Sequence, residues 1–312
     1  MVAAGAQPIG LKLFSGARNW RICGCMKNFL KMHGLGNDFI ILDARGDSDF
    51  SVSPAAARAL CDRRRGIGCD QLLIIRDSDT ADIIMEILNS DGSASEACGN
   101  GTRCVADVVM QETGADRISI DTTGGLLAAH YDTRMGERLI AVDMGPVGMG
   151  WQDVPLNAEM DTLHVPLGHD LPPAVCHSMG NPHAVVFVDD VAQIDLVSIG
   201  PLIETSAAFP QRVNLSFVQQ VGPAQFRMRV WERGAGITMA CGSGACAVGV
   251  AIHRRGLGGR QNEIIMDGGP VHIDWVDDGS EAGRVMLIGP VAYAFAGELS
   301  QPLQQLLEHG HG

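Results

Sequence analysis

Hydrophobic and polar residues alternate in several short segments of the chain, and this period of two is typical of strands that bury one face. Two other segments, 102–110 and 245–254, instead space their apolar residues along one face of a helix. The expected strands are 27–32, 85–88, 117–121, 138–143 and 226–231. The sequence therefore predicts an α+β fold in which a β-sheet wraps around a central helix in each half of the chain.

A motif in the first half of the chain recurs in the second half. The segment 97–101, with the sequence ACGNG, returns as ACGSG at 240–244, an offset of 241 − 98 = 143 residues. A duplicated fold repeats its turns, but amide, carboxyl and thiol side chains also recur here, which indicates a shared function. We expect two pseudo-symmetric domains with the active site in the cleft between them. The paired polar residues, at offsets of 143 or 144, are Asn37 with Asn181, Gln71 with Asn214, Asn89 with Glu232, and Cys98 with Cys241.

The composition of the chain changes near residue 26. Residues 1–25 contain Lys12, Arg18 and Arg21 but no acidic residue, and they lack the continuous apolar core of a secretory signal. We expect this segment to be a disordered extension, or the result of a start codon assigned too far upstream, and the fold to start at Met26. The expected N-terminal domain is 26–143, completed by a returning C-terminal strand at about 288–300, and the expected C-terminal domain is 144–287.

Charge and cysteine content exclude several classes of protein. The net charge is 23 − 36 = −13, which disfavours a surface that follows nucleic-acid phosphates. No uncharged apolar run approaches the roughly 20 residues of a membrane-spanning helix, and the nine cysteines show no disulfide framework. We expect a cytoplasmic protein without nucleic-acid or membrane partners. The basic run 63–65 is expected to be a solvated helix end.

Cys98 and Cys241 each stand at the predicted N-terminus of a helix. There, the helix dipole and free backbone N–H groups favour a thiolate and can bind a carboxylate. Two symmetry-related thiols indicate racemisation or epimerisation, because one base can remove a proton from one face of a carbon while the other returns a proton to the opposite face. The helix ends are then placed to stabilise the charge that develops on the adjacent carboxylate.

Three other interpretations are open on these residues alone. A single cysteine with His183 is the pattern of a nucleophile and its base. A second interpretation is a cofactor-independent racemase that acts on another amino acid, such as proline or glutamate. A third interpretation is a non-catalytic thiol or metal-binding protein that uses both cysteines as ligands. Against a zinc site, Cys98 and Cys104, or Cys241 and Cys246, lack the required spacing.

Several segments closely resemble the diaminopimelate epimerase family, and the resemblance extends from Met26 to about Leu299. It implies interconversion of LL- and meso-2,6-diaminopimelate in the biosynthesis of lysine and peptidoglycan precursors, without pyridoxal phosphate, another cofactor or a metal. It also implies two pseudo-symmetric domains and a homodimer. The matching segments are KMHGLGNDF at 31–39, NSDGS at 89–93, EACGNGTRC at 96–104, GNPH at 180–183 and WERGAGITMACGSGACA at 231–247.

The resemblance assigns roles to the residues that match the family motifs. It implies that Cys98 and Cys241 are the two bases and that His183 and Glu232 assist them. The chain departs from the family at Ile237, where many members carry glutamate, and at Cys69, where a small apolar residue is usual; we expect both departures to be tolerated. Arg233 is the expected partner of the distal carboxylate. The substrate-binding residues implied are Asn37, Gln71, Asn89, Gly99, Asn100, Asn181, Asn214, Glu232, Arg233, Gly242 and Ser243.

Overall fold

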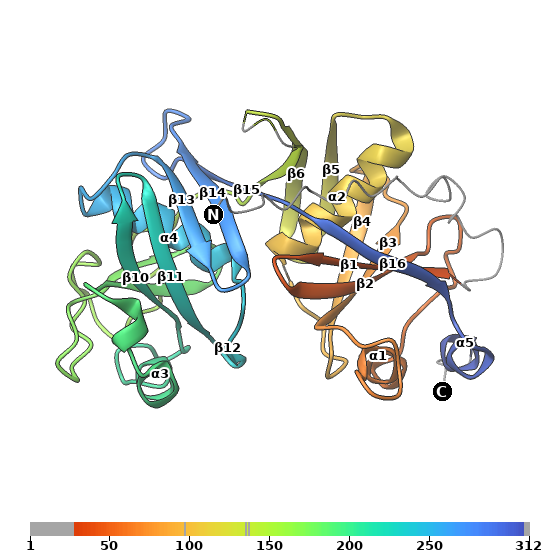
Figure 1. Cartoon of the computed structure of the whole chain (residues 1–312), viewed down its shortest axis with the longest axis horizontal. Coiled ribbons are helices and arrows are strands. Elements are labelled where there is room, and N and C mark those ends of the chain that lie inside the picture. Colours follow the sequence, from red (N-terminus) through yellow and green to blue (C-terminus); the bar gives the residue numbers. More distant parts are fainter. Residues whose placement is uncertain (1–27, 97, 135, 137, 309–312) are drawn as a thin grey trace, which may run out of the picture.

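The computed structural model describes residues 28–96, 98–134, 136 and 138–308, so the predicted extension at 1–25 and the predicted start at Met26 lie outside the described residues. The chain forms two halves that lie side by side (Figure 1). The first half contains β1 (Asn28–Gly34), β2 (Asn37–Asp43), α1 (Pro54–Cys61), β3 (Gln71–Arg76), β4 (Ile83–Asn89), α2 (Gly99–Thr113), β5 (Arg117–Thr122), β6 (Gly125–Asp132) and β7 (Leu139–Asp143). The second half contains β8 (Val175–Ser178), β9 (Pro182–Phe187), the 3₁₀ helix η1 (Val191–Gln193), α3 (Leu196–Glu204), β10 (Asn214–Gly222), β11 (Gln225–Glu232), β12 (Gly236–Ile237), α4 (Gly242–Arg254), β13 (Gln261–Met266), β14 (Gly269–Val276) and β15 (Arg284–Gly289). The chain ends with β16 (Ala292–Glu298) and α5 (Gln301–Glu308).

One continuous sheet runs through both halves in the order β16-β1-β2-β3-β4-β5-β6-β7-β15-β14-β13-β11-β10-β9-β8. Corresponding strands run in the same relative direction: β2 and β3 are parallel, as β9 and β10 are. Likewise, β4 and β5 are parallel, as β11 and β13 are. The two halves therefore repeat one α+β unit, which confirms the predicted class of two pseudo-symmetric domains.

The two halves join through the antiparallel strands β7 and β15. Asp143 lies opposite Met286 in this pairing, and the two residues are 286 − 143 = 143 positions apart, which is the offset of the sequence repeat. A twofold axis through this point of the sheet places equivalent residues opposite each other, as is seen here. The last strand, β16, returns to the first half and pairs with β1 (Figure 1).

A buried helix lies against the sheet in each half, α2 in the first and α4 in the second. Every residue of α2 from Gly99 to Met110 is buried. This helix ends at Gly114, whose φ of 74° is left-handed and costs a glycine little strain. The predicted helices at 102–110 and 245–254 are confirmed, and both begin directly after a cysteine N-cap, Cys98 or Cys241. The first residues of both helices are therefore largely buried, with Cys241 buried and Cys98 partly buried beside them. Among the described residues, no helix is long and apolar enough to cross a membrane.

The buried His177 of β8 gives the fold a pH-dependent stability. Its Nε2 lies 2.8 Å from the carbonyl oxygen of Ala247 on α4, and burial, with the nearby charge of Arg254, lowers its pKa to about 3. An imidazole in the unfolded chain titrates near a pKa of about 6.5. Acid below that value therefore protonates the unfolded state first, and the free energy of unfolding falls by up to about 1.4 kcal/mol per pH unit for such a histidine.

We expect His177→Gln to reduce this acid sensitivity. Between pH 7 and pH 4.5, the loss of unfolding free energy should be smaller in the variant than in the wild type by about 2 kcal/mol. Urea unfolding at the two pH values measures the difference. The exposed His169→Gln is the matched control and should behave as the wild type does. An equal loss in all three proteins would show that His177 does not carry the effect.

Candidate active site

The two cysteines of the sequence repeat occupy equivalent places in the fold. Cys98 is the N-cap of α2, and its Sγ accepts a hydrogen bond of 3.4 Å from the backbone N–H of Gly101. Cys241 is the N-cap of α4. The first N–H groups of a helix lack intrahelical partners and carry the positive end of the dipole. Each thiol therefore stands at a position that favours negative charge.

The two helix N-termini meet at the junction of the halves. A Cβ placed on Gly242 would lie 3.7 Å from the Cα of Gly99, an ordinary contact distance, so the two segments adjoin. The side chain of Leu287, from the junction strand β15, packs against both glycines, and its Cδ2 would lie 2.8 Å and 2.9 Å from a Cβ on Gly99 and Gly242. The side-chain amide of Asn100 also crosses the junction and lies 3.5 Å from the carbonyl oxygen of Ala240. Cys98 and Cys241 are thus attached to adjoining segments.

Cys98 contacts an amide side chain of the first half, and further amides of that half lie at the same ends of the strands. Its Sγ lies 3.7 Å from Asn37 Oδ1, which also accepts a hydrogen bond of 3.2 Å from Asn100 Nδ2. Gln71 Nε2 donates to Asn89 Oδ1 at 2.9 Å. Asn37 and Gln71 begin the parallel strands β2 and β3, and Asn89 ends the antiparallel β4, so all three residues lie at one edge of the sheet. This topology brings the predicted amides of the first half together.

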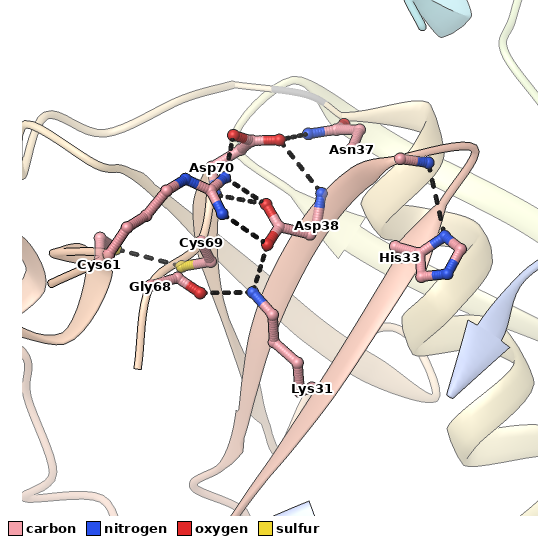
Figure 2. Close-up of polar contacts among 10 residues, drawn as sticks. Lys31, His33, Asn37, Asp38, Cys61, Gly68, Cys69 and Asp70 are labelled. Carbon is pink, nitrogen blue, oxygen red and sulfur yellow. Dashed lines mark hydrogen bonds and ion pairs between the residues drawn. The ribbon is translucent and has the colours of Figure 1, made fainter. Parts of the chain in front are cut away.

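An ionic network holds Asn37 in one orientation (Figure 2). Asp70 Oδ2 accepts a hydrogen bond of 3.0 Å from Asn37 Nδ2, so the amide oxygen of Asn37 faces Cys98. Arg63 bridges Asp70 and Asp38 at 2.7 Å and 2.6 Å, and Lys31 pairs with Asp38 from below. Burial alone would raise the pKa of Asp38, but hydrogen bonds from Arg63 and Lys31 outweigh it and lower the pKa to about 2.

This network was missed from the sequence. The run 63–65 follows α1 and is exposed, as expected for a solvated helix end, and Arg63 is in addition paired with two carboxylates beside the site. The position of Asp70 directly before Gln71 was an available signal. Cys69, one of the two positions at which the chain departs from the family, contacts another cysteine: its Sγ lies 3.3 Å from the Sγ of the buried Cys61 (Figure 2).

Cys241 is surrounded by different polar groups. Its Sγ lies 3.7 Å from Ser243 Oγ, which accepts a hydrogen bond of 3.3 Å from Asn181 Nδ2. His183 Nε2 lies 2.8 Å from Asn181 Oδ1. Burial and the charge of Arg233 lower the pKa of His183 to about 3, so its ring is neutral. His183 thus contacts Asn181, and no hydrogen bond joins it to either thiol among the described residues.

Glu232 is the carboxylic acid that interacts with the Cys241 thiol. It ends β11, accepts a hydrogen bond from Thr238 and interacts with Cys241. Burial raises the pKa of Glu232, and burial followed by the charge of Glu232 raises the pKa of Cys241 well above its usual value. The pair therefore resists the loss of a proton. For Cys98, burial and, to a smaller extent, the charge of Glu232 raise the pKa to about 11, and the Gly101 N–H and the Arg103 charge oppose that rise.

Asn214 and Arg233 form the outer part of the second half of the site. Asn214 is buried, donates to the carbonyl oxygen of Pro182 at 3.0 Å and accepts from the backbone N–H of Arg233 at 2.9 Å. The exposed Arg233 guanidinium makes one hydrogen bond of 3.3 Å, to the carbonyl oxygen of Gln211. A second edge of this planar group is geometrically able to take a carboxylate.

Within the described part of the chain, no group of three or more His, Cys, Asp or Glu side chains could hold a metal ion.

Comparison with solved structures defines the class of fold. The fold is similar to that of a hydroxyproline epimerase from Agrobacterium vitis, with a TM-score of 0.63, 16% identity, and coverage of 88% of this chain and 91% of that chain. A phenazine biosynthesis protein of the PhzF family from Bacillus anthracis has a TM-score of 0.62 and 16% identity, covering 88% of this chain and 99% of its own. The chain therefore has the pseudo-symmetric two-domain fold of this class.

Comparison of sequences defines the family. A family profile described as "Diaminopimelate epimerase" matches residues 29–150 and 175–293. The chain is 52% identical over 273 residues to the diaminopimelate epimerase of Acidiphilium cryptum, covering 87% of this chain and 95% of that protein. It is 50% identical over 281 residues to that of Rhodospirillum centenum, covering 89% and 94%. The chain belongs to the diaminopimelate epimerase family, which confirms the resemblance and the predicted enzyme class, an isomerase independent of pyridoxal phosphate.

Proposed function

We propose that this chain interconverts LL-2,6-diaminopimelate and meso-2,6-diaminopimelate by removing and returning a proton at the α-carbon. The observation that supports this most directly is the meeting of two buried helix N-termini, each with a cysteine N-cap. Relatives that share half of the sequence are named for the same substrate. We place the enzyme in the cytoplasm, in the formation of lysine and peptidoglycan precursors.

The helix ends are proposed to bind the carboxylate next to the reacting carbon. Gly99 and Asn100 open α2, and Gly242 and Ser243 open α4, so their N–H groups have no intrahelical acceptor. When the α-proton leaves, negative charge spreads into this carboxylate. Because two helix dipoles converge on it, this charge is stabilised more strongly than the charge of the ground state.

The proton transfer uses one cysteine on each face of the carbon. The thiolate of one cysteine takes the α-proton and becomes a thiol, and the C–H electron pair passes into the carbanion. The thiol of the other cysteine gives its proton to the opposite face and becomes the thiolate. The carbon is inverted, and the negative charge has moved from one cysteine to the other.

The surroundings of the thiols indicate how this charge arises. Because the pKa values of both thiols are raised, a thiolate needs positive charge nearby, and the ammonium group of the amino acid substrate brings one. We assign Glu232 as the group that exchanges a proton with Cys241. We assign His183 to hold Asn181, and through it Ser243, in position. The amides Asn37, Gln71, Asn89 and Asn214 are proposed to orient the substrate.

The decisive experiment follows the α-hydrogen in deuterium oxide. LL-diaminopimelate incubated with the protein should gain deuterium at one α-carbon as meso-diaminopimelate appears, measured by mass spectrometry and chiral chromatography. Proline and glutamate should gain none. Exchange with proline or glutamate alone would identify a different racemase, and no exchange with any amino acid would leave only a non-catalytic binding function.

Arg233 is proposed to recognise the distal carboxylate of diaminopimelate. Arg233→Lys keeps the charge but removes the planar pair of donors. We expect kcat/KM for diaminopimelate to fall by about 10- to 150-fold, equivalent to the roughly 1.5 to 3 kcal/mol of a hydrogen bond to a charged group. The measurement compares diaminopimelate with an analogue that lacks the distal carboxylate. Equal losses for both substrates would place Arg233 at the reacting carbon or in folding instead.

We also propose that the enzyme is a homodimer. Strand β16 lies at the end of the sheet order, with β1 on one side. It exposes Tyr293 by 38% and Phe295 by 53%, which is unusual for aromatic residues on an edge strand. A second copy of the chain is the occupant that the family resemblance implies for an apolar surface of this kind.

A further inference from the structure

Between residues 97 and 104, the sequence repeat that carries the two cysteines differs from its copy at four positions, and Asn100 and Arg103 are two of them. In the offset of 143 residues, Asn100 of the first half corresponds to Ser243, and Arg103 corresponds to Cys246. Both replacements remove a large polar side chain from the second half. Asn100 and Arg103 also contact each other, because Arg103 Nη2 donates to Asn100 Oδ1 at 2.9 Å. One half thus supplies a pair of residues that its duplicate lacks.

Arg103 is a charged residue without a counter-ion in the part of the chain that the structure describes. Its side chain is fully buried, with 0% of the residue exposed. Its Nε and Nη1 find no hydrogen-bond acceptor, and no carboxylate among the described residues forms an ion pair with it. Asp107, one turn further along α2, pairs with Arg138 instead, at 3.3 Å. An unpaired buried charge costs several kcal/mol of folding free energy in general, so its presence calls for another explanation.

Arg103 occupies the junction between the halves. A Cβ on Gly34 of β1 would lie 3.2 Å from its Nη2, and a Cβ on Gly289 of β15 would lie 3.4 Å from its Cζ. Among the described residues, the titratable groups that act on its charge are the thiols Cys98, Cys104 and Cys246. A thiolate at Cys98 would therefore balance the charge of this guanidinium.

The contact with Asn100 extends the reach of Arg103 to both cysteines. Because Asn100 Oδ1 accepts from Arg103, its Nδ2 must point away, toward Asn37 Oδ1 at 3.2 Å and the carbonyl oxygen of Ala240 at 3.5 Å. Asn37 is the acceptor that contacts Cys98, and Ala240 directly precedes Cys241. The Arg103 guanidinium therefore orients the Asn100 amide, which contacts Asn37 beside Cys98 and Ala240 beside Cys241.

We propose that Arg103 is a positioning residue of the active site, which aligns the two cysteine-bearing helix ends through Asn100 and supplies the buried positive charge that balances a thiolate at Cys98. The proposal rests on the proposed epimerase function. It explains why one arginine is sufficient for a duplicated site, since a residue at the junction serves both halves. It also explains why the chain tolerates an unpaired charge in its core: the cost is borne in stability and the benefit is in catalysis.

The test compares three variants with the wild type in four measurements: kcat, KM, melting temperature and the rate of Cys98 alkylation by iodoacetamide. Arg103→Met removes the charge and keeps the apolar length, whereas Arg103→Lys keeps the charge and loses the planar fork. Arg254→Met is the matched control. Arg254 is a second, partly buried arginine, and its hydrogen bonds go to the Cys176 carbonyl oxygen at 3.0 Å and to Thr162 Oγ1 at 2.8 Å rather than to the surroundings of Cys98 or Cys241.

We expect Arg103→Met to lower kcat by about 10- to 100-fold, with KM changed less than about threefold. Its alkylation rate at Cys98 near pH 8 should fall about tenfold, because the thiolate loses its balancing charge. Its melting temperature should equal or exceed that of the wild type. Arg103→Lys should restore the alkylation rate and part of kcat. Arg254→Met should lower the melting temperature and leave the alkylation rate unchanged.

Three results would overturn the proposal. One is a kcat in Arg103→Met within threefold of the wild type. Another is an unchanged alkylation rate beside a lowered melting temperature, which is the signature of a structural role. The third is an Arg103→Met protein that does not fold. A wild-type protein without α-carbon exchange would reject the proposed function instead, while alkylation rates and melting temperatures would still decide the role of Arg103.

Discussion

Cys98→Ala and Cys241→Ala are each expected to lower kcat for diaminopimelate epimerisation by at least about 10³-fold. Each thiol stands at its own helix N-terminus and serves one face of the carbon, so neither can replace the other. The loss should be in kcat, because the helix N–H groups that bind the carboxylate remain. The measurement is conversion of LL-diaminopimelate followed by chiral chromatography.

Cys176→Ala is the control for these two variants. Cys176 is a buried thiol too, but it packs in a separate core cluster of the second half. Its replacement should cost comparable stability and leave kcat within about threefold of the wild type. Retention of more than a tenth of the wild-type kcat by either Cys98→Ala or Cys241→Ala would contradict a reaction with two bases.

Glu232→Gln is expected to lower kcat/KM by about 100-fold. The amide has the shape of the carboxyl group and can still accept a hydrogen bond from Thr238, but it cannot exchange a proton with Cys241. Because a catalyst does not change an equilibrium constant, the loss must be the same from LL- to meso-diaminopimelate and in reverse. Initial rates in both directions measure it.

Glu86→Gln is the matched control for Glu232→Gln. Glu86 lies on β4, the strand equivalent to β11, and its carboxylate pairs with Arg76 rather than with a thiol. Its replacement should leave kcat/KM unchanged. If Glu232→Gln is as active as Glu86→Gln, the proton of Cys241 is exchanged by another group.

The repeat of segments at a fixed offset made much of the fold predictable. Strands expected at 117–121 and 226–231 are β5 (Arg117–Thr122) and β11 (Gln225–Glu232). A period of two or of 3.6 residues reports on burial of one face, which these elements have. The placement of the polar residues at strand and helix ends also follows from the repeat, because equivalent positions of a duplicated fold meet at its axis.

The ionic and electrostatic details were not predictable in the same way. The orientation of Asn37 depends on Asp70, 33 residues away, and the charge of Arg103 has no visible signal except its unequal partner in the repeat. That His183 assists the thiols stays a prediction, and its contact with Asn181 could not be read from the sequence. Side-chain contacts across a fold depend on distances that periodicity does not encode.

The pairing of β16 with β1 has a consequence for synthesis of the chain on the ribosome. Asn28 lies opposite Glu298, so the first described strand acquires its outer neighbour only after 298 − 28 = 270 further residues have been translated. Until then, β1 is the edge of an incomplete sheet, and an open edge is a template for pairing with other chains. Contacts so distant in sequence also slow folding. The nascent N-terminal half therefore has to remain unaggregated, with β1 uncovered, until almost the whole protein has emerged.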